Sequence, residues 1–146
     1  MSDQRAPSRS WESLETVRHS LGGAWSQADL GAAFDVTALS VIGELDPTGA
    51  HGTVREVLSL FGKSLEPELE RIEACLAQPA MASQLKVEAH RLKGAAAQMG
   101  ALRLAAACKL VEQTCAAGAT ENTTECAEAL IAEIIRVQRR LSRLLA

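Results

Sequence analysis

The feature that most limits what this chain can fold into is a run of apolar residues spaced three or four apart between residues 54 and 78. Its members are Val54, Val57, Leu58, Phe61, Leu65, Leu69, Ile72 and Leu76. Such spacing puts apolar side chains on one side of an α-helix, which has about 3.6 residues per turn. Pro67 falls inside the run, and proline removes a backbone donor and crowds the preceding turn. We therefore expect one long helix bent near Pro67, and the alternative is two helices separated there.

Three later stretches repeat this spacing and predict three more long helices. They cover residues 81–98, residues 101–117 and the chain after a turn-like segment at 120–124. Proline at 79 and glycines at 100 and 118 are typical of the residues that end helices. Short connections make successive helices antiparallel, so we expect an all-α fold, an antiparallel up-and-down four-helix bundle. An aromatic content of only 3% suits such a bundle, because its core is then built from small and aliphatic side chains.

The N-terminal part of the chain is expected to add one short helical segment to the bundle. Residues 36–45 predict a short helix across one end, capped by Asp35 or Thr37. Its apolar side would carry Leu39, Ile42 and Leu45. We assign residues 1–35 to an N-terminal extension, partly disordered or forming a short helix, and residues 36–146 to the bundle.

Charge and composition exclude several classes of function. The formal net charge is −3 and there is no basic arm, which argues against nucleic-acid binding. No apolar run is long enough to cross a bilayer, so no membrane association is expected. The four cysteines form no CxxC pairs and no secretory signal precedes them, which indicates a reducing cytoplasm. Cys108 and Cys115 are expected to be small core side chains, and no metal site is predicted.

His90 is the residue that points to a function. On a helix over 81–98 it lies opposite the apolar stripe that contains Leu85 and Leu92, so we expect it to face solvent. Gly94 follows one turn later, and glycine inside a helix costs about 1 kcal/mol relative to alanine. A glycine at this position suggests that another molecule approaches the helix closely beside His90.

The stretch around His90 resembles a known signature. Ala89-His90-Arg91-Leu92-Lys93-Gly94, with Gly100-Ala101-Leu102-Arg103-Leu104 behind it, is similar to the motif of histidine-containing phosphotransfer (HPt) domains of two-component phosphorelays. The similarity extends more loosely from about Val36 to the C-terminus. The resemblance implies that His90 is the phosphoacceptor. It also implies that the partner is the receiver domain of a response regulator or hybrid histidine kinase, whose own aspartate and bound Mg²⁺ complete the reaction centre, so this chain needs no cofactor.

The residue chemistry agrees with that role. A neutral imidazole has a lone pair on one ring nitrogen and can attack a phosphoryl group without first losing a proton. Lys93 could stabilise charge on the transferring oxygens, because such transfer depends on positioning and charge compensation. The receiver is expected to dock on the exposed side of the same helix, which carries Lys86, Val87, Gly94, Ala97 and Gln98.

The leading hypothesis is a free-standing relay protein, and three alternatives stay open at this stage. The chain could be a phosphorelay domain detached from a larger histidine kinase, or a non-catalytic helical adaptor that binds a signalling partner through the His90 face. A metal-binding bundle is disfavoured because His19, His51 and His90 lie in unrelated segments. The sequence has no ATP-binding motif, so we expect no kinase activity of its own, and whether the chain counts as an enzyme is left open. A monomer is expected.

Overall fold

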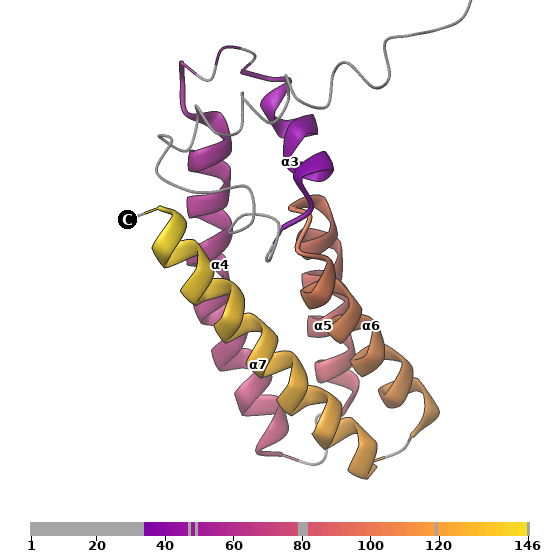
Figure 1. Ribbon diagram of the computed structural model, residues 1–146. Helices are drawn as coiled ribbons and strands as arrows, with labels where there is room; N and C mark the ends of the chain where they lie inside the picture. The colour runs from indigo at the N-terminus through magenta and orange to yellow at the C-terminus, as the bar shows by residue number, and fades with distance from the viewer. Residues whose placement is uncertain (1–33, 47, 49, 79–81, 119, 146) are drawn as a thin grey trace, which may run out of the picture.

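Four long helices follow one another along the chain and pack as an up-and-down bundle (Figure 1). They are α4 (Thr53–Leu76), α5 (Ala82–Gln98), α6 (Leu102–Ala117) and α7 (Thr120–Leu144). The computed structural model describes residues 34–46, 48, 50–78, 82–118 and 120–145, and this part contains helices and no strands. The all-α four-helix bundle predicted from the sequence is confirmed. The extension predicted for residues 1–35 lies almost wholly outside the described residues.

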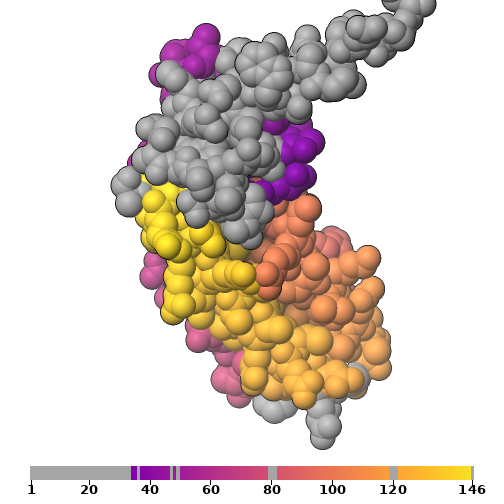
Figure 2. Space-filling view, viewed as in Figure 1, coloured from indigo at the N-terminus to yellow at the C-terminus, as the bar shows by residue number. Residues whose placement is uncertain are grey.

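The core is formed by the apolar stripes that the helices turn toward one another. Each helix packs against its neighbours in the sequence, and α7 closes the bundle by packing against α4. Figure 2 shows the surfaces of α6 and α7 lying against each other on one face. The largest fully buried apolar side chains are Leu39, Val54, Leu58, Leu65, Ile72, Leu104, Leu130 and Ile134. Full burial of one such side chain contributes about 1.5–3 kcal/mol, so these stripes are the main source of the bundle's stability.

Helix α4 runs without interruption through Pro67. The side chain of Pro67 is exposed, so the carbonyl of residue 63, which loses its usual donor, lies on the side where water can reach it. The single long helix predicted from the sequence is confirmed and a break into two helices is wrong, whereas the bend near Pro67 stays a prediction.

The start of α4 is capped by a side chain from the preceding turn. Gly52, at the N-cap position, has a left-handed backbone (φ 61°) and provides no side-chain cap. Asp46, only 2% exposed, instead accepts hydrogen bonds from the backbone N–H groups of His51 and Thr53, each at 3.2 Å. Burial raises the pKa of Asp46, but these hydrogen bonds outweigh it and leave the pKa below its usual value of 3.8.

A short helix, α3 (Val36–Gly43), lies at the end of the bundle where α5 turns into α6 (Figure 1). Asp35 is its N-cap and accepts the backbone N–H of Thr37. Phe34 and Leu39 are buried in the core. The prediction that Leu45 lies on the apolar side is wrong, because α3 ends at Gly43 and the chain then turns, which leaves Leu45 80% exposed.

The turn predicted from the sequence at residues 120–124 is also wrong. Helix α7 already begins at Thr120, so these residues form its first turn. Thr, Asn and Glu side chains are tolerated there because the first turn of a helix leaves backbone N–H groups free to bond polar side chains or water.

The described residues give no sign of a metal site or of a membrane helix. All four cysteines are free thiols; Cys75 and Cys108 are buried, whereas Cys115 and Cys126 are partly exposed. No group of three potential metal ligands occurs in the described ranges. In the same ranges, no helix combines the length and the apolar character that crossing a membrane requires.

Candidate functional site

His90 projects from the middle of α5 away from the core. The core side of this helix carries Leu85, Ala89, Leu92 and Ala96, all buried. The side chain of His90 is 73% exposed, so it faces solvent as its helical position predicts.

A carboxylate from the neighbouring helix fixes one nitrogen of the His90 ring. Nδ1 of His90 lies 3.2 Å from Oε2 of Glu112 on α6. Burial raises the pKa of Glu112, but hydrogen bonds and charge from Lys93 and His90 outweigh it and lower the pKa below its usual value. An ionised carboxylate can only accept a hydrogen bond, so the proton of the neutral imidazole is on Nδ1 and its lone pair is on Nε2.

Lys93 shares the same carboxylate. Its Nζ lies 2.9 Å from Oε1 of Glu112, and its side chain is 33% exposed. Lys93 is therefore not the freely solvated lysine that an exposed helix position implies by default. The structure joins His90 and Lys93, one helical turn apart on α5, through Glu112.

The other residues predicted for the docking face share the exposed side of α5 with His90. Lys86, Val87, Gly94, Ala97 and Gln98 are all exposed, and no hydrogen bond or ion pair links any of them to His90 among the described residues. A Cβ atom added at Gly94 would meet nothing within 4 Å. Internal packing therefore gives no reason for a glycine at this position.

Glu112 is the site residue that does not appear among those predicted from the sequence. Two signals could have found it. It is the only acidic residue between Leu102 and Ala117. Residues equally far from the turn of an antiparallel helix pair lie side by side, and Glu112 follows Ala101 by as many positions as His90 precedes it.

The arrangement is suited to nucleophilic chemistry at Nε2. The Glu112 carboxylate accepts the Nδ1 proton and so keeps the His90 ring in one tautomer and one orientation. A carboxylate orients the histidine of a catalytic triad in the same way. The side chain of His90 is mostly exposed and the position of Gly94 is open, so the surface around the ring has room for a large substrate such as another protein domain.

Comparisons with known proteins identify the family and the fold to which this site belongs. A sequence profile described as the Hpt domain matches residues 56–144. A crystal structure from rice, described as a histidine-containing phosphotransfer protein, aligns with a TM-score of 0.70 and 18% identity over 93% of this chain and 93% of that chain. At this identity the likeness shows a shared fold. Curated proteins gave no match.

The matched region runs from the first turn of α4 to the end of α7, and so contains nearly all of the four-helix bundle together with His90, Lys93 and Glu112. It begins after the boundary predicted between residues 35 and 36, which stays a prediction. Because the match covers more than half of the sequence, the chain belongs to the Hpt domain family and has a phosphotransfer role in two-component signalling.

Proposed function

We propose that His90 takes a phosphoryl group from the aspartyl phosphate of one receiver domain and passes it to the aspartate of another. The observation that supports this proposal most directly is the contact of 3.2 Å between Nδ1 of His90 and Glu112. This contact keeps the proton on Nδ1, so the lone pair is on Nε2, the ring nitrogen on the far side from α6.

In the first step Nε2 attacks phosphorus in line with the bond to the aspartate oxygen. The N–P bond forms, the P–O bond breaks, and the aspartate leaves as a carboxylate. The ring keeps its proton on Nδ1, so the phosphorylated imidazole carries a positive charge opposite Glu112, whose carboxylate stabilises it. In the second step an aspartate of the next receiver attacks phosphorus, the N–P bond breaks, and the ring returns to its neutral form.

Lys93 is assigned charge stabilisation at the transferring group. Phosphoryl transfer passes through a loose transition state, so charge compensation and positioning supply most of the catalysis. The ammonium of Lys93 already lies within 2.9 Å of the carboxylate that holds His90. After phosphorylation, the phosphoryl oxygens compete with Glu112 for this ammonium.

The exposed side of α5 is assigned to receiver docking. Hpt domains interact with receiver domains of response regulators or kinases. The face around His90 combines an open position at Gly94, the small side chain of Ala97 and an apolar edge at Val87, which is 52% exposed. Lys86 and Gln98 add polar contacts at its margins. Mg²⁺ is expected on the receiver, beside its aspartate, and the Hpt chain supplies only the histidine.

The test is transfer of labelled phosphate from a phosphorylated receiver to the full chain. His90→Gln should fold normally, because the side chain is mostly in solvent, and should take up no label. His51→Gln is the matched control, since His51 is an exposed histidine in the turn before α4. It should be labelled like the parent protein.

The alternative function is an adaptor that binds a partner through the same face without chemistry. It predicts a complex with the receiver but no acid-labile phosphate on His90. Labelling that persists in His90→Gln and disappears in His51→Gln would overturn the assignment of the acceptor.

A further inference from the structure

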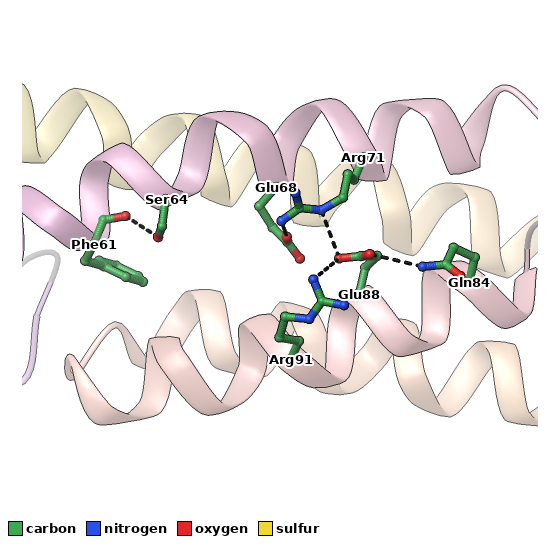
Figure 3. Close-up of polar contacts among 7 residues, drawn as sticks. All are labelled: Phe61, Ser64, Glu68, Arg71, Gln84, Glu88 and Arg91. Atoms are coloured by element: carbon green, nitrogen blue, oxygen red, sulfur yellow. Dashed lines mark hydrogen bonds and ion pairs between the residues drawn. The ribbon is translucent and has the colours of Figure 1, made fainter.

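Two glutamates are buried between α4 and α5, on the side of α5 turned away from His90. Glu68 of α4 is 4% exposed and Glu88 of α5 is 2% exposed. Among the described residues, Asp46 is the other buried charged side chain. Figure 3 shows the carboxyl groups of Glu68 and Glu88 facing each other in the space between the two helices.

The two carboxyl groups differ in how well they are partnered. Oε2 of Glu88 lies 3.3 Å from Nε of Arg71 and 3.3 Å from a terminal nitrogen of Arg91, while Oε1 accepts a hydrogen bond of 3.1 Å from the side-chain amide of Gln84. Glu68 pairs with Arg71 through Oε2. Its Oε1 is buried and has no hydrogen-bond partner within the described ranges.

An ionised Glu68 would leave a negatively charged oxygen buried and unpartnered beside a second carboxylate. Burying an unpartnered charge is costly, and two like charges in contact add repulsion. A proton on Oε1 removes both penalties, because the resulting hydroxyl can donate to the Glu88 carboxylate. We propose that the α4–α5 interface is a proton-binding site in which neutral Glu68 shares its proton with ionised Glu88.

The direction of the pKa shifts supports this placement of the proton. Burial raises the pKa of Glu68, and hydrogen bonding to Glu88 together with the charge of Glu88 raises it further, against the lowering effect of Arg71. Burial also acts to raise the pKa of Glu88, but hydrogen bonds from Glu68 and Gln84 and the charges of Arg91 and Arg71 leave it lowered.

Among the described residues, Arg71 is the cation whose hydrogen bond and charge lower the pKa of Glu68. The titratable groups that interact with Glu68 are Arg71 and Cys75 from α4, Glu88 from α5 and Cys108 from α6. Arg91 of α5 pairs with Glu88 and so acts on Glu68 only indirectly. Burial raises the pKa of Cys108 to about 12, so that thiol is neutral. On α7 the partly buried acid is Glu133, which pairs with Arg103 and Arg136, and α3 contains no charged residue.

The site makes the α4–α5 contact depend on pH in two directions. The stability contributed by neutral Glu68 is lost as the pH rises through its raised pKa, because the unfolded chain then releases the proton more readily. The stability contributed by ionised Glu88 is lost as the pH falls through its lowered pKa. Glu88 precedes His90 by two residues on α5. The contact of this helix with α4 is therefore most stable at pH values between the lowered pKa of Glu88 and the raised pKa of Glu68.

Matched substitutions test the proposal at neutral pH on the full chain. Glu68→Gln imitates the protonated form, since its amide donates to Glu88 while its carbonyl accepts from Arg71. Its urea midpoint should lie at or above that of the parent protein, because the unfolded parent chain releases the Glu68 proton at neutral pH and the glutamine variant has no proton to regain on folding. Glu88→Gln leaves two arginines facing a neutral amide, so its midpoint should fall clearly below the parent value. Glu70→Gln, an exposed glutamate on α4, is the control and should leave the midpoint unchanged.

A titration of the parent protein gives an independent readout and decides the matter if Glu88→Gln fails to fold. The side-chain carboxyl carbon of Glu68, followed by NMR, should titrate above the range of an ordinary glutamate, and that of Glu88 below it. Equal losses of stability in Glu68→Gln and Glu88→Gln, or titration of Glu68 in the ordinary range, would overturn the proposal. None of these readouts depends on phosphotransfer.

Discussion

The backbone N–H of Asp35 donates a hydrogen bond of 2.7 Å to the carbonyl oxygen of Gly100, and so ties the start of α3 to the turn between α5 and α6. Gly100 has a φ of +76°, a conformation that side chains other than glycine rarely adopt. A Cβ atom there would lie 2.7 Å from the carbonyl oxygen of Asp35. Glycine is therefore required at this position both by backbone conformation and by close contact.

Replacing Gly100 with alanine should destabilise the fold by more than about 1 kcal/mol, measured by urea unfolding, because both requirements are violated. Gly118→Ala is the matched control. Gly118 has a φ of +74°, yet a Cβ atom there meets nothing within 4 Å, so only the backbone strain should be felt. Equal losses in the two variants would mean that the contact with Asp35 adds nothing to stability.

Removing the carboxylate of Glu112 should slow phosphate uptake by His90. In Glu112→Ala the ring loses the acceptor that holds Nδ1, and misplacement of a reacting atom by about 1 Å can lower the rate about a hundredfold. Glu112→Gln should be intermediate, because an amide oxygen still accepts the Nδ1 proton but carries no charge to balance the phosphorylated ring. Single-turnover transfer from a phosphorylated receiver measures both variants.

The control for Glu112 is its exposed neighbour Gln113, whose replacement by alanine should leave the rate unchanged. A small phosphodonor such as phosphoramidate separates ring positioning from receiver docking. Glu112→Ala should be slow with both donors. Parental rates with both donors would show that Glu112 does not position the ring.

Asp46 should make the stability of the fold depend on pH in the acid range. Its pKa is lower in the folded protein than the usual 3.8, because it accepts backbone hydrogen bonds from His51 and Thr53. This contribution is fully present above the pKa of the unfolded chain and is lost as the pH falls through the lowered pKa of the folded state. Asp46→Ala should therefore be less stable than the parent protein at pH 7, and the difference should shrink on acidification.

Urea midpoints measured from neutral to acid pH check this sign. Asp35→Ala is a useful comparison, since Asp35 caps the shorter helix α3 through Thr37. If the difference in urea midpoint between Asp46→Ala and the parent protein stayed constant from neutral to acid pH, the ionised carboxylate of Asp46 would not be the group that stabilises the fold.

The long helices could be predicted because each buries one apolar stripe, and a stripe is visible in the sequence. All eight members of the run from Val54 to Leu76 are buried or partly buried. The end of α3 could not be predicted in this way. Leu45 continues the spacing of Leu39 and Ile42, but a helix of eight residues depends on tertiary contacts for its end, and these are not visible in local spacing.

The exposed position of His90 could be predicted from one helix alone, whereas the contacts of its ring depend on how helices pair. Glu112 contacts His90 only because the turn at Gly100 sets the register of α5 against α6. Glu68 gave a clearer signal, since it occupies the apolar stripe of α4 between Leu65 and Ile72. A carboxyl group within a core stripe must find a partner in the interior.

Gly94 offers the sharpest test of the docking face, because two explanations of this glycine predict different results. If it is only an exposed helix position, Gly94→Leu should gain up to about 1 kcal/mol of stability from helix propensity and transfer phosphate at the parental rate. Space for the new side chain exists, since a Cβ atom there meets nothing within 4 Å. If a receiver must approach closely beside His90, stability should still hold or rise while transfer falls.

Transfer from the receiver to Gly94→Leu should accordingly fall by up to about a hundredfold, because a bulky side chain one turn from His90 holds the two reacting atoms apart. Gly94→Ala is the graded control and should lose much less, since a methyl group adds little height to the surface. Acetyl phosphate or phosphoramidate should label all three proteins at similar rates, because a small donor needs no flat face. Parental transfer from the receiver to Gly94→Leu would contradict docking at Gly94, and a large loss of stability would show that α5 needs glycine there for its own packing.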